Sequence, residues 1–391
     1  MSEWKRVKFF ELFSEPTKNG IYKTKEFHGH GAKIINMGEI FAYAFIGKQN
    51  MNRVELNGKE RNSFLVNNGD LLFARRSLVE SGAGKCSIVY GLSEETTFES
   101  SIIRVRLNER IANPLYYMYW MRSLKGRTAI NGIVSGVNVK GIRSSDLRNI
   151  DVDFPPLDIQ HRIATILFRY DSLIENYQKQ IKLLEESAQR LYKEWFIDFR
   201  FPGHENTKIV DGVPEGWEKK TLDSFCNVFT GKKNANQGVS NGKYKFFTCG
   251  DTPLLIDSYI YDGPAIIISG NGSYTGRTTF YEGKFDLYQR TYACSMKDMQ
   301  DKNLIYGLFE IVKCELTNKI SGGTHGAAIP YIVMSDVTKF DFLYEENIMQ
   351  RFSSIMHNIL SESLSLLNQI RHLTEARDRL LPKLMSGEIN V

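Results

Sequence analysis

The stretch that decides the fold runs from Ile159 to Trp195 and reads IQHRIATILFRYDSLIENYQKQIKLLEESAQRLYKEW. Its apolar residues follow one another almost entirely in alternating steps of four and three, which is the spacing of a coiled-coil seam with one stutter. The seam consists of Ile159, Ile163, Ile166, Tyr170, Leu173, Tyr177, Ile181, Leu184, Ala188, Leu191 and Trp195. Asp158 is suited to cap the helix, and Phe201-Pro202-Gly203 ends it. We therefore predict one helix of about 40 residues, which at ~1.5 Å per residue is about 60 Å long.

A second stretch near the carboxy-terminus has the same character. Its apolar positions are Ile348, Phe352, Ile355, Ile359, Leu366, Ile370, Leu373 and Leu380. Because a long amphipathic helix cannot bury its apolar stripe alone, we predict that the two helices pair antiparallel and act as a spacer. The alternative is that each stripe packs only against the domain beside it.

An internal repeat relates the two halves of the chain. A shift of 190 residues places residues 130–160 on residues 320–350 with eight identities, which include Gly132 on Gly322, Gly136 on Gly326, Asp146 on Asp336 and Asp151 on Asp341. The sequence EWKRVKFF around Trp4 resembles GWEKKTLD around Trp217, and the pair Gly84-Lys85 parallels Gly276-Arg277. The chain is therefore organised as domain, helix, domain, helix.

The two domains are rich in glycine, aromatic residues and short β-branched runs with turn signals such as Asn68-Gly69 and Asp262-Gly263. We predict an α+β (mixed α/β) fold: two strand-rich globular domains in a pseudo-two-fold repeat, separated by two long antiparallel helices. The predicted boundaries are 1–154 for the first domain, 155–202 for the first helix, 203–343 for the second domain and 344–391 for the second helix.

Composition limits the function classes only weakly. The 50 Lys and Arg against 45 Asp and Glu give a net charge of +5, which is compatible with a polyanionic partner without demonstrating one. No window reaches the roughly 18 apolar residues of a membrane span, and MSEWKRVKFF lacks the apolar core of a signal peptide, so we expect a cytoplasmic protein without a membrane partner. The five scattered cysteines are expected to be reduced and mostly buried.

Basic residues on predicted loops are the candidates for DNA contacts, since cations bind phosphates and Arg and Lys also address base edges. Lys85 and Arg277 come first because they recur in both halves, followed by Arg75, Arg76, Lys232 and Lys233. For any single cation, a solvated surface position is the alternative. Apolar residues on the helices that we expect to be exposed are candidates for partner docking, with packing inside the chain as the alternative; these are Leu167, Phe168, Leu183 and Phe196.

Three motifs that suggest catalysis are incomplete. Asn113-Pro114-Leu115-Tyr116 resembles the Asn-Pro-Pro-Tyr tetrad of amino-methyltransferases but lacks the second proline, so we interpret Asn113 as a helix N-cap and Pro114 as the first helical residue. Residues 81–85 (SGAGK) fail the phosphate-loop pattern, because Lys85 is followed by Cys86. His28 and His30 have no evident third and fourth metal ligand and are expected on a loop. We predict no catalytic, cofactor-binding or metal-binding residue.

Four segments resemble the specificity subunits of type I restriction-modification systems. They are RLYKEWFIDFRFPGHE (190–205), GVPEGWEKKTLDSF (212–225), FPPLDIQHRIATIL (154–167) and LTEARDRLLPKLMSGEI (373–389). The resemblance implies a non-catalytic chain with two target-recognition domains, each recognising one half of a bipartite site in double-stranded DNA. It also implies two methyltransferase subunits that dock on the helices and bind S-adenosylmethionine, and restriction subunits that use ATP and Mg²⁺, with no cofactor on this chain.

Two other functions stay open from the sequence. The chain could be an orphan recognition module of a related restriction or modification enzyme, or a coiled-coil scaffold that does not bind DNA. A scaffold predicts no salt-dependent DNA binding, whereas phosphate contacts make binding fall steeply with salt.

Overall fold

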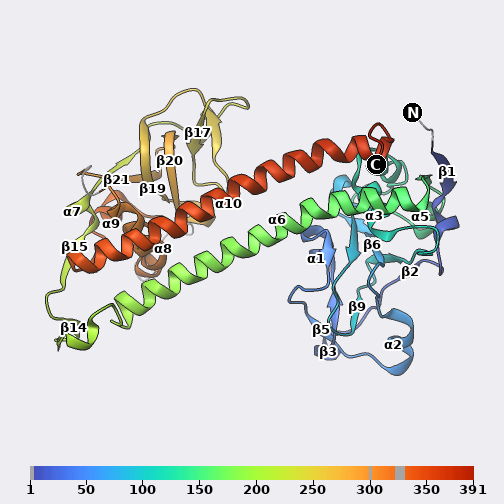
Figure 1. Cartoon of the computed structure of the whole chain (residues 1–391), viewed down its shortest axis with the longest axis horizontal. Coiled ribbons are helices and arrows are strands. Elements are labelled where there is room, and N and C mark those ends of the chain that lie inside the picture. Colours follow the sequence, from blue (N-terminus) through green and yellow to red (C-terminus); the bar gives the residue numbers. More distant parts are fainter. Residues whose placement is uncertain (1–3, 299–301, 322–330) are drawn as a thin grey trace. The chain divides into compact units, whose positions relative to one another are not determined.

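The computed structural model describes residues 4–298, 302–321 and 331–391, which form two compact units. Unit 1 contains residues 1–175 and 370–391, and unit 2 contains residues 176–369. The division falls inside two long helices, α6 (Leu157–Tyr192) and α10 (Glu346–Ser386), so each helix contributes one part to each unit (Figure 1). The boundaries that we predict between domains and helices stay a prediction.

Unit 1 is built around a five-stranded sheet with the spatial order β2 (Lys18–Asn19), β10 (Ile102–Val105), β6 (Leu71–Ala74), β8 (Cys86–Val89) and β4 (Phe45–Ile46). The central strands β10, β6 and β8 are buried along their whole length, as expected for near-continuous apolar runs. A second sheet has the order β5 (Arg53–Val54), β3 (His28–Ile35) and β9 (Thr96–Phe98). The helices before α6 are α1 (Met37–Ala42), α2 (Gly58–Phe64), α3 (Pro114–Arg122), α4 (Leu124–Asn131) and α5 (Ser144–Arg148).

Unit 2 contains a six-stranded sheet with the spatial order β16 (Cys226–Thr230), β21 (Thr291–Met296), β19 (Tyr261–Ser269), β20 (Thr278–Leu287), β17 (Tyr244–Phe247) and β18 (Leu254–Ile256). Its other elements are the short pair β13 (Ile209–Val210) and β14 (Val213–Pro214), and the helices α7 (Leu222–Phe225), α8 (Leu304–Ser321) and α9 (Met334–Thr338). The core of this unit includes Ala188 and Trp195 from the end of the first long helical segment and Met349 and Phe352 from the start of α10.

The internal repeat is confirmed by strand register. In unit 1, β1 (Lys5–Lys8) pairs antiparallel with β12 (Asp151–Phe154), so that Lys5 lies opposite Phe154. In unit 2, β15 (Glu218–Thr221) pairs antiparallel with β22 (Asp341–Tyr344), so that Glu218 lies opposite Tyr344. The shifts are those of the sequence match, 213 residues for the first strand and 190 for the second. Gly322 and Gly326, two of the matched glycines, lie outside the described residues.

The long helix predicted from Ile159 is confirmed, with two corrections. The helix begins at Leu157 and continues after Tyr192 as a π-helical turn over Lys193–Ile197, which places Asp158 in its first turn and not at the cap. Leu173 is exposed, and the neighbouring Ile174 is the half-buried residue at that point of the stripe. The predicted seam residue Ile166 is half-buried, and the neighbouring Leu167 is fully buried. With Leu167 and Ile174 in place of Ile166 and Leu173, a row of low-exposure residues follows steps of four and three without a stutter: Ile163, Leu167, Tyr170, Ile174, Tyr177, Ile181, Leu184 and Ala188.

Helix α10 shows the same regularity. The Glu345 carboxylate accepts a hydrogen bond from the Ile348 amide (2.8 Å), which caps the helix in place of the prolines that precede α6. One row of its buried and half-buried positions follows steps of four and three: Phe352, Met356, Ile359, Ser363, Leu366, Ile370, Leu373, Arg377, Leu380 and Leu384. Ile355, which we expected in this stripe, is exposed.

Candidate nucleic-acid interface

In unit 1, strands β6 and β8 are joined by a loop whose two ends are fixed by backbone hydrogen bonds. The Ala74 amide donates to the Lys85 carbonyl (2.9 Å), and the Gly84 amide donates to the Ala74 carbonyl (2.8 Å). Gly84 has a φ of 65°, and a Cβ atom at this position would clash with the Ile130 side chain. Only glycine fits there without strain. Lys85 is therefore held at a fixed place directly before β8.

The corresponding loop of unit 2 joins β19 to β20 and has the same hydrogen bonds. The Ser269 amide donates to the Arg277 carbonyl (3.0 Å), and the Gly276 amide donates to the Ser269 carbonyl (2.8 Å). Gly276 also has a positive φ, 83°. Lys85 and Arg277 thus occupy equivalent positions in the two units, as the sequence repeat predicted.

A second segment lies against each of these loops. The Ile142 amide donates to the Arg75 carbonyl (3.0 Å), and the Ile332 amide donates to the Gly270 carbonyl (2.9 Å). In unit 1 this contact extends into a two-stranded ribbon of β7 (Arg76–Ser77) and β11 (Lys140–Gly141). We call residues 75–84 with 135–141 the unit 1 tip, and residues 270–276 with Tyr331 the unit 2 tip. Residues 322–330 lie outside the described part of the chain.

Lys85 is half-buried and forms contacts inside unit 1. Its ammonium donates to the Phe41 carbonyl (2.6 Å) and lies 6.0 Å from the Phe41 ring centre. Burial lowers the pKa of Lys85, and the positive charges of Arg122 and Arg127 lower it further. Lys85 thus connects the loop to α1. Its contact with DNA stays a prediction, and such a contact requires the ammonium to exchange its hydrogen bond to the Phe41 carbonyl for one to DNA.

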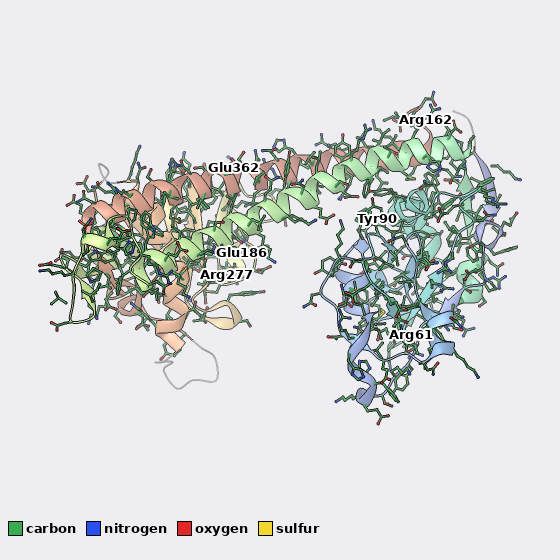
Figure 2. All side chains as sticks on the ribbon, turned by 60° about the horizontal axis from the view of Figure 1, so that its bottom comes forward. Arg61, Tyr90, Arg162, Glu186, Arg277 and Glu362 are labelled. Carbon is green, nitrogen blue, oxygen red and sulfur yellow. The ribbon has the colours of Figure 1, made fainter. Side chains whose placement is uncertain are left out.

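Arg277, labelled in Figure 2, holds a neighbouring loop of unit 2. Its guanidinium donates to the Asp251 carboxylate (2.7 Å) and to the backbone carbonyls of Gly250 and Asp251 (2.7 Å each). The group also lies 4.7 Å from the ring centre of Tyr274. A phosphate at this position has to compete with Asp251, so the geometry favours a role in shaping the tip.

The other predicted cations are more accessible. Arg76 is exposed and Arg75 half-buried, and both lie on the unit 1 tip. Lys232 is exposed, whereas the Lys233 ammonium lies 3.7 Å from the buried carboxylate of Asp286.

The structure places Lys232, Lys233 and Arg277 on adjoining segments of unit 2. The Gln289 amide donates to the Lys233 carbonyl, and the carbonyl of the next residue, Arg290, accepts from the Gly270 amide of the tip.

Sequence reasoning missed a set of exposed aliphatic side chains on the unit 1 tip. Leu78 is 84% exposed and Val137 is 91% exposed, and Val79 and Val139 beside them are also exposed. The available signal was the presence of valines in SGVNVK (135–140), a glycine-containing turn in which polar residues are the norm.

Our expectation that four apolar helix residues are exposed was wrong for two of them. Leu167 is buried in the core of unit 1, and Phe196 is buried in unit 2, where its ring contacts Trp217 and Phe352. Phe168 is half-buried, with its ring against Phe45 and Tyr90. Leu183 is 61% exposed, and it and Phe168 remain candidates for partner docking.

The three discounted motifs have structural roles. The Asn113 carboxamide oxygen accepts a hydrogen bond from the Tyr116 amide (2.9 Å), and Pro114 is the first residue of α3, so the N-cap interpretation is confirmed. The residues around Lys85 form the loop described above. His28 and His30 begin strand β3, so the expected loop was wrong, and His30 lies 3.2 Å from the Glu55 carboxylate. Among the described residues, no group of three or more His, Cys, Asp or Glu side chains is arranged to bind a metal ion.

The cysteines are free, and three of them are buried: Cys86, Cys226 and Cys294. Burial raises the pKa of the Cys86 and Cys226 thiols to about 12. Within the ranges that the structure describes, no helix has the length and apolarity needed to cross a membrane.

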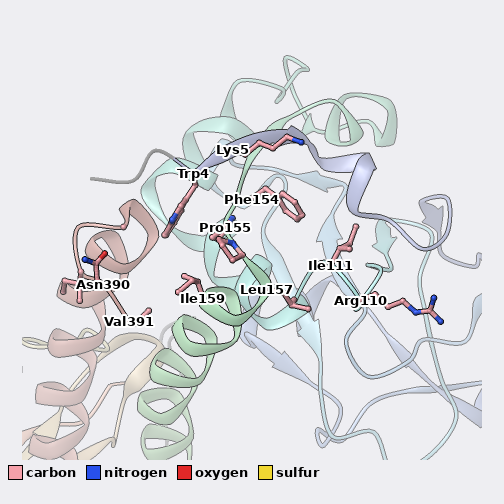
Figure 3. A pocket seen from close by; sticks show the side chains of 13 residues that line it. Trp4, Lys5, Arg110, Ile111, Phe154, Pro155, Leu157, Ile159, Asn390 and Val391 are labelled. Carbon is pink, nitrogen blue, oxygen red and sulfur yellow. The ribbon is translucent and has the colours of Figure 1, made fainter.

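A hollow of about 780 Å³ in unit 1 has a different character from the tips. Its lining combines Trp4, Pro155, Ile159 and Val391 with the cations Lys5 and Arg110 (Figure 3). In unit 2 the counterpart of Trp4 is Trp217, which is covered by the rings of Phe199 and Phe201. Because the lining is mainly apolar, we place the candidate DNA interface at the tips and not in this hollow.

Two equivalent domains, each with a loop tip on a shared strand framework, define a protein built of repeated domains. The family model described as "Type I restriction modification DNA specificity domain" matches residues 1–186 and 214–355, and the chain belongs to this family.

Curated relatives are specificity subunits of type I restriction enzymes. The chain is 26% identical over 398 residues to the MjaIX specificity subunit of Methanocaldococcus jannaschii, a match that covers 94% of this chain and 89% of the relative. It is 29% identical over 182 residues to the EcoDI specificity subunit of Escherichia coli, covering 45% of this chain and 39% of that protein. The crystal structure of a type I restriction-modification S subunit from M. genitalium has the same fold, with a TM-score of 0.67, 16% identity and coverage of 97% and 96%.

Proposed function

We propose that this chain is the DNA-recognition subunit of a type I restriction-modification complex and that each unit reads one half of a bipartite site. The observation that carries the proposal is the equivalence of the two tips: the same glycine, cation and backbone hydrogen bonds recur in both units. The side chains on the tips differ, with aliphatic residues in unit 1 and Asn271, Ser273 and Tyr274 in unit 2. The two units thus share the same loop backbone but present different side chains, as expected if they recognise half-sites of different base sequence.

We further propose that α6 and α10 pair as an antiparallel coiled coil that sets the distance between the half-sites. The heptad spacing of low-exposure residues on both helices supports this pairing. Within unit 1, the Asp171 carboxylate of α6 accepts hydrogen bonds from Tyr119 of α3 and from Arg377 of α10. In this proposal the recognition domains are residues 1–154 and 203–343, and the spacer helices are residues 155–202 and 344–391.

The proposed partners are two methyltransferase subunits and the restriction subunits of the complex. S-adenosylmethionine, ATP and Mg²⁺ belong to those partners, because recognition is the task of this chain. The exposed side chain of Leu183 on α6 is a proposed docking contact for a methyltransferase subunit.

Mapping of adenine methylation across the genome of the source cell, with and without this gene, tests the proposal. We expect one bipartite motif to lose its methylation while other motifs keep theirs. If every motif stays methylated, the purified chain is combined with the methyltransferase encoded beside it and tested on random DNA. Failure of this complex to methylate any bipartite motif would contradict the proposal.

A further inference from the structure

The unit 1 tip exposes a group of aliphatic side chains to solvent. Leu78 directly follows β7 and Val139 directly precedes β11. Because Ser77 lies opposite Lys140, these two residues continue the paired strands at the same end of the ribbon. Val79 and Val137 extend the set, and all four side chains are exposed. Exposed apolar surface that is concentrated in one place and bordered by polar residues marks an interaction site.

Positive charge surrounds this apolar surface. Arg76 and Lys140 lie on the two strands of the ribbon, and Arg143 lies two residues after β11. None of these three side chains forms an ion pair with a residue in the described ranges. The opposite charge on the tip comes from Glu80. The tip therefore has aliphatic side chains in its middle and cations beside them. This arrangement is complementary to a partner in which phosphate groups flank an apolar group.

The tip is held firmly enough to present a fixed shape. Ser135 and Gly141 exchange two backbone hydrogen bonds (2.9 and 2.8 Å), and Gly136 has a φ of 105° at the turn between them. The Arg127 guanidinium donates to the carbonyls of Ser81 (3.2 Å) and Ala83 (3.3 Å), which fixes the other loop. Little ordering of these loops is therefore needed when the partner binds.

The major groove of DNA has the width for a two-stranded ribbon, and the thymine methyl group is the apolar feature of its floor. We propose that the unit 1 tip enters the major groove of its half-site, where Leu78 and Val137 contact thymine methyl groups and Arg76 and Lys140 bind the flanking phosphates. This inference rests on the proposed function. The described part of the unit 2 tip presents Asn271, Ser273 and Tyr274. The proposed methyl contact is therefore assigned to the half-site of unit 1.

Replacing thymine by uracil tests the contact, because it removes the methyl group and leaves the hydrogen-bonding edge unchanged. The reconstituted methyltransferase complex is titrated with duplexes that carry uracil at each thymine of one half-site in turn. We expect affinity to fall about three- to tenfold for at least one position in the unit 1 half-site, in keeping with the burial of roughly one methyl group. The double variant Leu78→Ala, Val137→Ala binds the thymine and uracil duplexes equally.

Two further variants separate the methyl contact from other effects. Leu124→Ala removes a side chain that is 79% exposed in the same unit, on α4 outside the tip, and keeps the full sensitivity to uracil. Arg76→Ala weakens binding to both duplexes by the same factor and lowers the salt dependence by about one phosphate contact.

The inference is overturned if the wild-type complex binds its bipartite duplex but tolerates uracil everywhere in the unit 1 half-site, or if that half-site contains no thymine. It is also overturned if the double variant keeps the sensitivity of the wild type. A wild-type complex that fails to bind or methylate any bipartite duplex contradicts the proposed function itself, and the inference with it.

Discussion

At the scale of single residues, Gly84 fixes where the first cation of the repeat lies. Its φ of 65° is in the left-handed region, and a side chain would meet Ile130. We expect Gly84→Ala to lower the free energy of unfolding by about 1–3 kcal/mol, because a non-glycine residue is strained in this conformation. Urea denaturation of the chain measures the change.

A glycine with free space beside it is the matched control. Gly38 lies in α1, and a Cβ atom there would have no neighbour within 4 Å. Gly38→Ala is expected to leave stability unchanged or to raise it slightly, since alanine favours helix. Equal losses for the two variants would show that the loop conformation does not depend on Gly84.

The Asp171 carboxylate is a second residue with a measurable role. Its side chain is largely buried and accepts hydrogen bonds from Tyr119 and Arg377. We expect Asp171→Ala to cost about 1–3 kcal/mol of unfolding free energy, because both donors lose a buried partner. Removing the exposed pair of Asp158 and Arg162 through Arg162→Ala is the control, with an expected loss under about 0.5 kcal/mol. A cost for Asp171→Ala no larger than that of the control would contradict the role.

At the scale of elements, the heptad spacing on α6 and α10 would give the proposed spacer a defined unit of length. If the helices pair antiparallel with Asp171 beside Arg377, residues 174–180 face residues 368–374. Removing both heptads keeps the phase of the two seams and shortens the spacer by about 10 Å at ~1.5 Å per residue. We expect the gap in the recognised motif to shrink by about three base pairs, at ~3.4 Å per base pair, while both half-sites stay the same.

Methylation mapping of a cell that carries the shortened gene measures the new number of base pairs between the two half-sites directly. Removing residues 174–180 from α6 alone is the control, since it leaves helices of unequal length and is expected to abolish methylation. A change in the bases of either half-site, with the gap unaltered, would contradict the role of the helices as a spacer.

The sequence predicted the long helices well and their exposed faces less well. Apolar residues in steps of four and three are a local property, so α6 could be predicted from Ile159 onward. The choice between the adjacent Leu173 and Ile174 depends on what covers the helix, and the same is true of Leu167 and Phe196, which the domain cores bury. Contacts such as the one between Ile142 and Arg75 join residues far apart in the chain, so no local pattern reveals that they build a tip.

At the scale of the whole molecule, each recognition domain is enclosed by a pair of adjacent strands. In unit 2 these are β15 and β22, with Thr221 opposite Asp341. We expect that replacing residues 222–340 with the counterpart from a related specificity subunit changes one half-site and leaves the other half-site and the gap unaltered. Methylation mapping after the exchange measures all three. A changed half-site on the unit 1 side would contradict the independence of the two domains.

The pairing of β1 with β12 and of β15 with β22 also bears on how genes of this family can recombine. A domain whose first and last strands are neighbours can be inherited as one block, because a crossover within the codons of the paired strands leaves the remaining architecture intact. Recombination between two such genes then yields a new combination of half-sites in a single generation, without the accumulation of point mutations. The same strand pairs that close each domain would thus let whole domains be exchanged between related genes.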